Sequence, residues 1–292
     1  MDDATQKAAI LIEALPYILG FRRKFVVIKL GGSVMDDPDR MDALLTDVIF
    51  MEQVGMYPVM VHGGGPRISA AMKAAGIEPK WVNGLRYTDE ETLRVVCRVL
   101  VEEIGQEVID RLDRLGGKGV SVSGRNSHAL VATAKQTADG TDLGLVGEVV
   151  DVDRELCERL CIGGVIPVVA PIGRDKEGTL YNVNGDSAAG AVASHMRAEK
   201  LVFVSDVPGI LSDPEDEKTL LSSATRSEID LLVQGGKIAD GMLPKVAAGL
   251  EALDGGVHKT HIVSGKMKHA LLLEIFTAAG VGTQIVPDVE KP

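Results

Sequence analysis

The sequence predicts an α/β fold: an open, mainly parallel sheet sandwiched between helices in three layers. Short runs of apolar and β-branched residues, such as 25–28 and 58–61, alternate with longer segments whose apolar residues recur at helical spacing. Glycine-rich turns stand at the junctions between them. Strands that alternate with helices in this way pair in parallel and are covered on both faces, which gives the three layers.

Composition is typical of a globular chain and excludes several classes of protein. The 292 residues can form one large core or two lobes, and 45% of them are apolar. No apolar run is long enough to span a membrane and the acidic N-terminus lacks the basic start of a secretory signal, so we expect a cytoplasmic location. The net charge of −11 argues against a nucleic-acid surface. The three cysteines have neither metal-ligand nor disulfide spacing.

An amphipathic helix over residues 4–19 is the first predicted element. Pro16 lies inside its pattern and should kink or break it. The helix precedes the first strand and has no evident place in a phosphate site. A lone helix with an apolar stripe must bury that stripe against something, such as a second subunit.

Two strand–turn–helix units follow. Strand 25–28 leads into Lys29-Leu30-Gly31-Gly32-Ser33 and a helix over about 38–54, and strand 58–61 leads into His62-Gly63-Gly64-Gly65-Pro66 and another helix. Glycines let backbone N–H groups approach an anion closely, and the helix N-terminus adds a positive dipole. Both turns are candidate phosphate sites, although glycine pairs are also common in ordinary α/β turns.

The remaining elements continue the alternation. A capping box at Thr88 and Glu91 predicts the start of a long helix that ends near Gly116. Segments rich in glycine and aspartate between 120 and 152 suggest hairpins at a sheet edge. Further strands are expected at 165–170, 178–183, 201–204, 261–263 and 283–286, and further helices over 153–161, 187–196, 227–234, about 240–253 and 267–279.

A third turn of the same kind, Asn184-Gly185-Asp186, completes the set of anion-binding candidates. Lys29 and Lys245 stand at element boundaries near glycine turns. The chain contains no P-loop, no dinucleotide-binding fingerprint and no nucleophile elbow. The chemistry left is phosphoryl transfer by positioning and electrostatics, which needs cations and backbone N–H groups but little covalent catalysis.

Six short motifs stand in order along nearly the whole chain. They are Lys29-Leu-Gly-Gly-Ser, His62-Gly-Gly-Gly-Pro, Asn83-Gly-Leu-Arg86, Asn182-Val-Asn184-Gly-Asp186, Ser205-Asp206-Val-Pro-Gly and Asp240-Gly-Met-Leu-Pro-Lys245. Together they resemble the motif set of the acetylglutamate kinases, a branch of the amino-acid kinase family. Each motif is weak alone, whereas the ordered set is specific. Asn-Gly-Leu-Arg separates this branch from aspartate, uridylate, carbamate and glutamate 5-kinases.

The resemblance implies that the γ-phosphoryl group of ATP passes to the side-chain carboxylate of N-acetyl-L-glutamate. The products would be N-acetyl-L-glutamyl 5-phosphate and ADP, in the second step of arginine biosynthesis. That carboxylate is ionised at pH 7, so no general base is required, and the difficulty is that two anions must meet. Mg²⁺ would enter with ATP as the cofactor and would have no protein ligands of its own.

Residue roles also follow from the resemblance. Lys29 would neutralise the phosphoryl group in flight, Lys245 would neutralise the ADP leaving group, and Asp186 would hold both lysines in place. Arg86 would bind the α-carboxylate of the substrate, preferably as a bidentate pair. The other implied ligands are Gly64, Gly65 and Asn182 for the substrate, and Gly31, Gly32, Ser205, Asp206 and Gly209 for the phosphates and nucleotide.

The expected division is an N-terminal oligomerisation helix, 1–20, and a kinase domain, 21–292. Within that domain, an acetylglutamate-binding lobe would cover about 21–178 and a nucleotide-binding lobe about 179–292.

The N-terminal helix and residues 269–283 resemble features of the arginine-inhibited acetylglutamate kinases. Glu274 would pair with the guanidinium of L-arginine, the Gly280 turn would approach it closely, and Tyr17 would close the site from the helix. His269 opens the same signature. We therefore expect a homohexamer, a trimer of dimers, that L-arginine inhibits through a site distinct from the active site.

Other interpretations stay open at this point. The chain could be a glutamate 5-kinase, aspartate kinase, carbamate kinase or UMP kinase, or a non-catalytic amino-acid sensor of the same fold. Taken singly, Arg86 could be a surface arginine, Asp186 only a helix cap and Glu274 a solvated side chain. His62 is more readily explained as a structural residue below its glycine turn than as a catalyst.

Overall fold

An eight-stranded sheet forms the centre of the computed structural model, which describes residues 2–238, 240–277 and 280–288. Its order is β12-β14-β13-β11-β1-β2-β8-β5, and every neighbouring pair is parallel except β13 and β14. The mainly parallel sheet is as predicted. The strands are β1 Phe25–Leu30, β2 Tyr57–His62, β5 Gly119–Val122, β8 Ile166–Val169, β11 Lys200–Ser205, β12 Ser223–Thr225, β13 Lys259–Ser264 and β14 Thr283–Val286.

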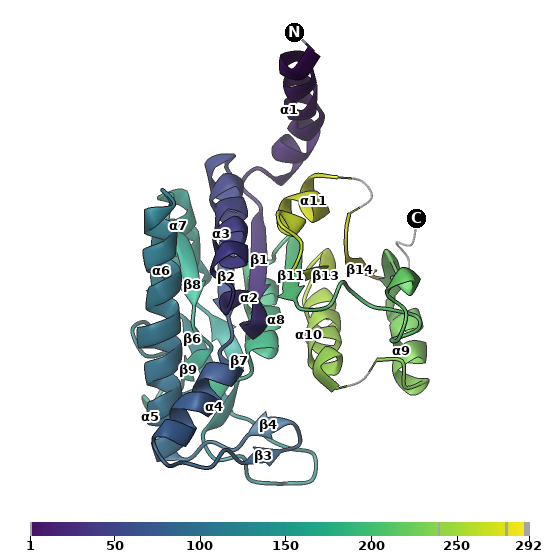
Figure 1. Cartoon of the computed structure of the whole chain (residues 1–292). Coiled ribbons are helices and arrows are strands. Elements are labelled where there is room, and N and C mark those ends of the chain that lie inside the picture. Colours follow the sequence, from purple (N-terminus) through teal and green to yellow (C-terminus); the bar gives the residue numbers. More distant parts are fainter. Residues whose placement is uncertain (1, 239, 278–279, 289–292) are drawn as a thin grey trace.

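Helices cover both faces of this sheet, because successive side chains of the central strands point to opposite sides. In β1, Val26 and Ile28 enter one apolar core, whereas Val27 enters the other. The first core is completed by α2 Gly32–Met35, α3 Pro38–Gln53, α4 Gly65–Ala74, α5 Glu90–Cys97, α6 Gly105–Arg114 and α11 Ala270–Phe276. The second is completed by α7 Arg154–Ile162, α8 Gly185–Met196, α9 Arg226–Gln234 and α10 Leu243–Asp254. The predicted three-layer architecture is confirmed (Figure 1).

The long helix predicted after residue 88 differs from the expectation in two respects. Its cap is Asp89 and not Thr88, because the Asp89 carboxylate accepts the Thr92 N–H at 2.8 Å, while the Thr88 hydroxyl donates to the Arg86 carbonyl at 2.8 Å. Between α5 and α6 the helix also widens into a π-helical segment, η1, Arg98–Ile104. Such segments are rare and occur often beside functional sites.

The glycine-rich middle of the chain contains antiparallel strand pairs as predicted, but they close into a small barrel and do not lie at the sheet edge. The pairs are β6 Leu130–Ala134 with β7 Val146–Val152, and β9 Ile172–Arg174 with β10 Leu180–Val183. Gly173 lies directly against the Ala132 side chain, so a larger residue there would hold the barrel open. A separate hairpin, β3 Trp81–Val82 and β4 Leu85–Arg86, lies beside α4 at the lower end of the molecule in Figure 1. Two short 3₁₀ turns, η2 Glu217–Thr219 and η3 Asp240–Met242, complete the elements.

The terminal helices also depart from the sequence pattern. Helix α1, Asp2–Phe21, passes through Pro16 without a break, projects from the body and contacts α11 (Figure 1). Its apolar residues are largely uncovered, with Leu11 67% and Leu19 61% exposed. The helix expected over 267–279 is shorter, because His269 is left-handed and α11 starts after it. Residues 278–279 lie outside the described part. Across the described ranges, no helix is long and apolar enough to cross a membrane.

Candidate active site

A cavity of about 210 Å³ opens where the chain leaves the carboxyl ends of β1 and β2, the usual place for ligands in an open α/β sheet. We call it the glycine pocket. All three predicted anion-binding turns line it, through Gly32, Gly63 to Gly65 and Asn184 to Asp186. The turns are in close contact, since a Cβ atom on Gly185 would lie 3.6 Å from the Gly63 Cα. The N-termini of α4 and α8 therefore meet in one cavity.

Lys29, Asp186 and Lys245 form a single ion triad at this cavity. Lys29 Nζ lies 2.7 Å from Asp186 Oδ1, and Lys245 Nζ lies 3.2 Å from Asp186 Oδ2. Lys29 and Asp186 are buried although they come from β1 and α8, far apart in sequence. Two cations share one carboxylate, so the triad carries a net positive charge.

The positive charge of the triad is placed at the start of a helix, and its member Lys29 is buried. Burial lowers the pKa of Lys29 from its ordinary value, and the Asp186 carboxylate opposes that shift. Asn184 caps α8, because its side-chain oxygen accepts the N–H groups of Asp186 and Ser187 at 2.9 and 3.1 Å. The positive end of this helix adds to the positive potential. The arrangement favours a ligand with several negative charges.

His62 lies beneath the second glycine turn. It is fully buried, and its Nδ1 lies 3.1 Å from the Gly63 carbonyl oxygen. Burial lowers the pKa of His62 to about 4. His62 is therefore neutral at pH 7 and shielded from the cavity. It supports the glycine turn above it, in agreement with the sequence analysis, which explained it as a structural residue.

Arg86 is 6% exposed, so the structure rules out the alternative of a surface arginine. One guanidinium nitrogen, Nη2, donates to the Ser69 hydroxyl at 2.8 Å and to the Gly65 carbonyl at 3.2 Å. Burial lowers the pKa of Arg86. The ring of Trp81 covers one face of the guanidinium at 4.6 Å. The β3–β4 hairpin thus presents a held cation to the glycine pocket.

The remaining predicted substrate and nucleotide residues fall into two groups. Asn182 lines the glycine pocket and donates from Nδ2 to the Thr88 hydroxyl at 3.1 Å. Ser205, Asp206 and Gly209 lie outside its lining, at the end of the adjacent strand β11. The two groups meet at Gly31, whose N–H donates to the Val204 carbonyl at 2.9 Å. The Ser205 hydroxyl donates to Asp206 at 3.1 Å.

A second cavity, about 440 Å³, lies between α1 and α11, and we call it the α1–α11 pocket. Tyr17, Glu274 and Gly280 all line it, as expected for residues that were predicted to form one site. Glu274 is buried and not solvated: Oε1 lies 2.6 Å from His261 Nδ1, and Oε2 accepts the N–H groups of Val281 and Gly282 at 2.7 and 2.9 Å.

His269 does not belong to this pocket, contrary to the prediction. Its Nδ1 lies 2.6 Å from Oδ1 of Asp47 on α3. His269 has a left-handed backbone at the start of α11, and its side chain contacts α3 and is not among the residues that line the α1–α11 pocket. Burial raises the pKa of Asp47 to about 6, and His269 opposes that shift.

Trp81, Lys200 and His261 are among the lining residues that the sequence prediction did not name as site residues. Trp81 could have been found, because the only tryptophan of the chain stands two residues before the Asn83-Gly84-Leu85-Arg86 motif. Lys200 and His261 of the α1–α11 pocket lie on strands whose apolar pattern gave no functional signal. Burial lowers the pKa of Lys200 to about 8, and Glu274 opposes the shift.

The described residues include no group of three or more histidine, cysteine, aspartate or glutamate side chains placed to hold a metal ion. Asp186, the carboxylate nearest the cavity, is already taken by two lysines. This donor set fits a Mg²⁺ ion that is held mainly by nucleotide phosphates and water, as Mg²⁺ commonly is.

Comparison with known proteins agrees with the family resemblance that the sequence motifs indicated. The model of the amino acid kinase family matches residues 24–264. An acetylglutamate kinase of Methanocaldococcus jannaschii is 45% identical, over 99% of this chain and 99% of its own. The family match contains every residue named in the glycine pocket.

Solved structures show the same fold. N-acetylglutamate synthase from Neisseria gonorrhoeae, complexed with coenzyme A and N-acetyl-glutamate, has a TM-score of 0.83 and 27% identity over 96% of this chain. The same synthase complexed with coenzyme A and L-arginine has a TM-score of 0.82 and 27% identity, again over 96%. The chain spans 63% and 65% of those two synthase chains.

Proposed function

The chain belongs to the acetylglutamate kinases of the amino-acid kinase family, and from this premise we propose that it transfers the γ-phosphoryl group of ATP to the side-chain carboxylate of N-acetyl-L-glutamate. The observation that carries the proposal is the Lys29–Asp186–Lys245 triad at a cavity lined by three glycine turns. N-acetyl-L-glutamyl 5-phosphate and ADP are the products.

Lys29 and Lys245 supply the charge that lets two anions meet. Lys29 is fixed beside the turns of the glycine pocket and neutralises the phosphoryl group during transfer. Lys245, from α10, neutralises the charge that develops on ADP. Asp186 holds both ammonium groups in place, so that no reorganisation is needed at the moment of reaction. Mg²⁺ supplies further neutralisation of the phosphate oxygens when it enters with ATP.

Arg86 binds the α-carboxylate of N-acetyl-L-glutamate. Its guanidinium is held by Trp81, Ser69 and Gly65, and it already faces the glycine pocket. The N–H groups of Gly64 and Gly65 and the Asn182 amide bind the rest of the substrate. Because the acceptor carboxylate is ionised at pH 7, positioning alone brings it to the phosphorus.

ATP lies on the β11 side of the pocket. Gly31 and Gly32 contact its phosphates, and Ser205, Asp206 and Gly209 line the nucleotide site beyond Gly31. This assigns residues 21–178 mainly to the substrate lobe and 179–292 mainly to the nucleotide lobe.

A substrate panel tests the proposal. ADP release with ATP and Mg²⁺ is expected with N-acetyl-L-glutamate and not with glutamate, aspartate, carbamate or UMP. Preference for one of the other acceptors would identify a different member of the family. Absence of turnover with all five would support the non-catalytic amino-acid sensor.

We infer that the α1–α11 pocket binds L-arginine and that binding inhibits the enzyme. Buried Glu274 provides an anion for the guanidinium and Lys200 a cation for the α-carboxylate, while Tyr17 joins the pocket to α1. The exposed apolar residues of α1 pack between dimers in a hexamer, a trimer of dimers. The synthase complexed with L-arginine shares the fold, which supports the inference.

Two variants separate assembly from effector binding. Deletion of residues 1–20 is expected to leave an active dimer with weakened arginine inhibition. Replacing Leu11 and Leu19 together by serine is expected to reduce the mass measured by light scattering while Tyr17 is retained. A truncated enzyme that stays hexameric and fully arginine-sensitive, or an intact enzyme that ignores millimolar arginine, would overturn the regulatory inference and leave the catalytic one standing.

A further inference from the structure

The helices that follow the two glycine turns are both held by one face of α6. Helix α4 starts at Gly65, immediately after its turn, and α3 follows the Gly31-Gly32 turn by way of α2. A side chain near the start of each helix pairs with α6, Arg67 of α4 with Glu107 and Asp42 of α3 with Arg111. The two turns also touch each other on the inner side, because a Cβ atom on Gly32 would lie 3.3 Å from the Pro66 Cδ.

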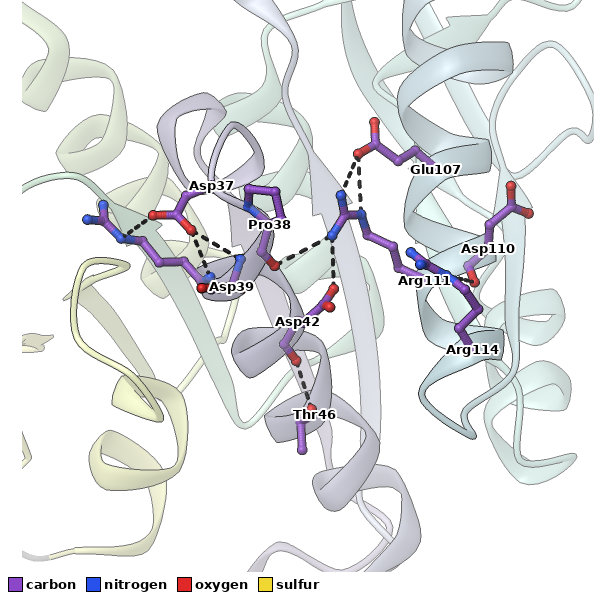
Figure 2. Close-up of polar contacts among 10 residues, drawn as sticks. Asp37, Pro38, Asp39, Asp42, Thr46, Glu107, Asp110, Arg111 and Arg114 are labelled. Carbon is purple, nitrogen blue, oxygen red and sulfur yellow. Dashed lines mark hydrogen bonds and ion pairs between the residues drawn. The ribbon is translucent and has the colours of Figure 1, made fainter.

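Arg111 connects α6 to the start of α3. Its Nη1 lies 2.9 Å from Asp42 Oδ1 and 3.5 Å from the Pro38 carbonyl oxygen, as Figure 2 shows. The Arg111 side chain is 14% exposed, whereas that of Asp42 is 45% exposed. Asp37 caps the same helix start by accepting the N–H groups of Asp39 and Arg40.

Glu107 extends the connection to α4. Arg111 binds Glu107 Oε1 with Nε and Nη2, at 3.3 and 3.2 Å, which leaves Oε2 free for another cation. Arg67, two residues after Gly65, takes that oxygen at 2.6 Å. One continuous chain, Asp42–Arg111–Glu107–Arg67, thus joins the N-terminal parts of α3 and α4.

Arg111 and Glu107, we propose, are positioning residues for phosphoryl transfer: they fix the separation between the turn that contacts the phosphates and the turn that holds the acceptor. The proposal rests on the proposed function. Arg67 is adjacent to Pro66, so a shift in the first turn of α4 moves the contact with Gly32. Misplacement of reacting groups by about 1 Å can cost about 100-fold in rate, whereas partly exposed ion pairs contribute little to the free energy of unfolding.

The test compares two neighbouring arginines of α6. Arg111→Gln removes the link to α3 and is expected to lower kcat about tenfold, with the KM values for ATP and N-acetyl-L-glutamate changed by less than about twofold. The matched control is Arg114→Gln, because Arg114 contacts the Asp110 carbonyl of its own helix at 3.4 Å (Figure 2). Its kcat is expected to stay at the wild-type value, and size-exclusion elution of both variants should match the wild type.

The energetic coupling between Glu107 and Arg111 is a second measurement, and a purely structural role of the two residues would not produce it. Glu107→Gln is expected to lower kcat to a similar degree, and the double variant should fall no further than either single one, because all three break the same chain. Arg111→Lys should recover part of the loss. Equal kcat for Arg111→Gln and Arg114→Gln, or additive losses in the double variant, would overturn the proposal.

Folding and the underlying activity are checked separately. If Arg111→Gln fails to fold, Asp42→Asn carries the same test from the exposed end of the chain, with the same expected fall in kcat and a wild-type kcat as the contrary result. A failure of the proposed function shows as a wild-type enzyme without acetylglutamate kinase activity. A failure of the positioning proposal shows as an active wild type whose variants match it.

Discussion

The two pockets of this molecule both contain a buried carboxylate but use it in different ways. In the glycine pocket, Asp186 is shared by two lysines and the site keeps a net positive charge. In the α1–α11 pocket, Glu274 is bound by His261 and by two backbone N–H groups, and further lining residues carry both signs of charge. The first pocket suits a polyanion, whereas the second suits a small ligand with separate positive and negative groups.

The pockets also differ in the source of their residues. The glycine pocket is built from turns that each follow directly after a strand, β1, β2 or β10, so each part is visible as a local motif. The α1–α11 pocket is assembled from α1, from the starts of β11 and β13, and from α11, which are distant in sequence. Chemistry that depends on strand-end turns is therefore easier to predict than a site between a terminal helix and the sheet.

The lysine triad gives the largest expected effect. Lys29→Met and Lys245→Met should each lower kcat by about 100-fold or more, the scale observed when one preorganised stabilising group is lost. Steady-state ADP release measures the change. The matched control is Lys24→Met, because Lys24 immediately precedes β1 at the opposite end from Lys29 and pairs with Glu199 at 3.2 Å. Near wild-type turnover in either triad variant would mean that the lysine is not needed for phosphoryl transfer. The positive charge of the triad would then no longer distinguish the glycine pocket from the α1–α11 pocket in function.

The buried histidine below the glycine pocket is expected to make stability depend on pH. His62 has a pKa of about 4 in the folded protein, against an ordinary value of 6.5. Between these values the unfolded chain takes up a proton that the folded protein does not, so the free energy of unfolding falls as pH decreases from 6.5 to 4. The fall amounts to about 3 kcal/mol.

A His62→Gln variant isolates this contribution, since glutamine does not titrate. Urea unfolding at several pH values should give a smaller loss for the variant than for the wild type. Asp47, whose raised pKa of about 6 gives a slope of opposite sign, is present in both proteins and cancels in the difference. Parallel curves would mean that His62 is accessible to protons in the folded state.

The sheet and most of the glycine pocket could be predicted from the sequence, because both depend on local patterns with a physical cause. Parallel strands buried on both faces read as short apolar runs, and the turns after them need glycine or a helix cap. Lys29, the Gly63–Gly65 turn and Asn184 each stand at such a junction. Lys29 and the Gly63–Gly65 turn lie close together because they follow the carboxyl ends of the neighbouring parallel strands β1 and β2, whereas Asn184 follows β10 of the barrel.

Features that depend on packing between distant segments could not be predicted. The Asp47–His269 contact joins residues 222 positions apart, and the pattern of α3 gave no sign that a carboxylate would be buried there. The barrel closes because Gly173 lies against Ala132, a contact that no local rule contains. The π-helical segment has an ordinary helical pattern, since apolar spacing does not distinguish i+4 from i+5 hydrogen bonding over two turns.

The effector pocket supplies the next largest effect. Glu274→Gln should raise the concentration of L-arginine that gives half inhibition by about tenfold or more, because a neutral amide cannot form a charge-assisted pair with a guanidinium. Inhibition is measured relative to each variant's own turnover. Asp288→Asn, an exposed change that lies outside the pocket lining, is the control. Unchanged arginine sensitivity in Glu274→Gln would place the effector elsewhere.

The smallest predicted effect concerns Trp81, the only tryptophan of the chain, which is 58% exposed beside Arg86. A cation–π contact at a partly exposed site contributes about 0.5–1 kcal/mol, so Trp81→Ala should raise the KM for N-acetyl-L-glutamate about two- to fivefold. The KM for ATP should not change, and Trp81→Phe should lie between wild type and alanine.

The same tryptophan reports which pocket a ligand enters. Binding of N-acetyl-L-glutamate to Arg86 changes the surroundings of the indole ring, so its fluorescence should shift and saturate as the ligand is titrated without ATP. The Arg86→Lys variant should need a higher concentration for the same shift, because a point charge cannot replace a stacked bidentate fork. A spectrum that responds to L-arginine and not to N-acetyl-L-glutamate would contradict the assignment of the two pockets and exchange their ligands.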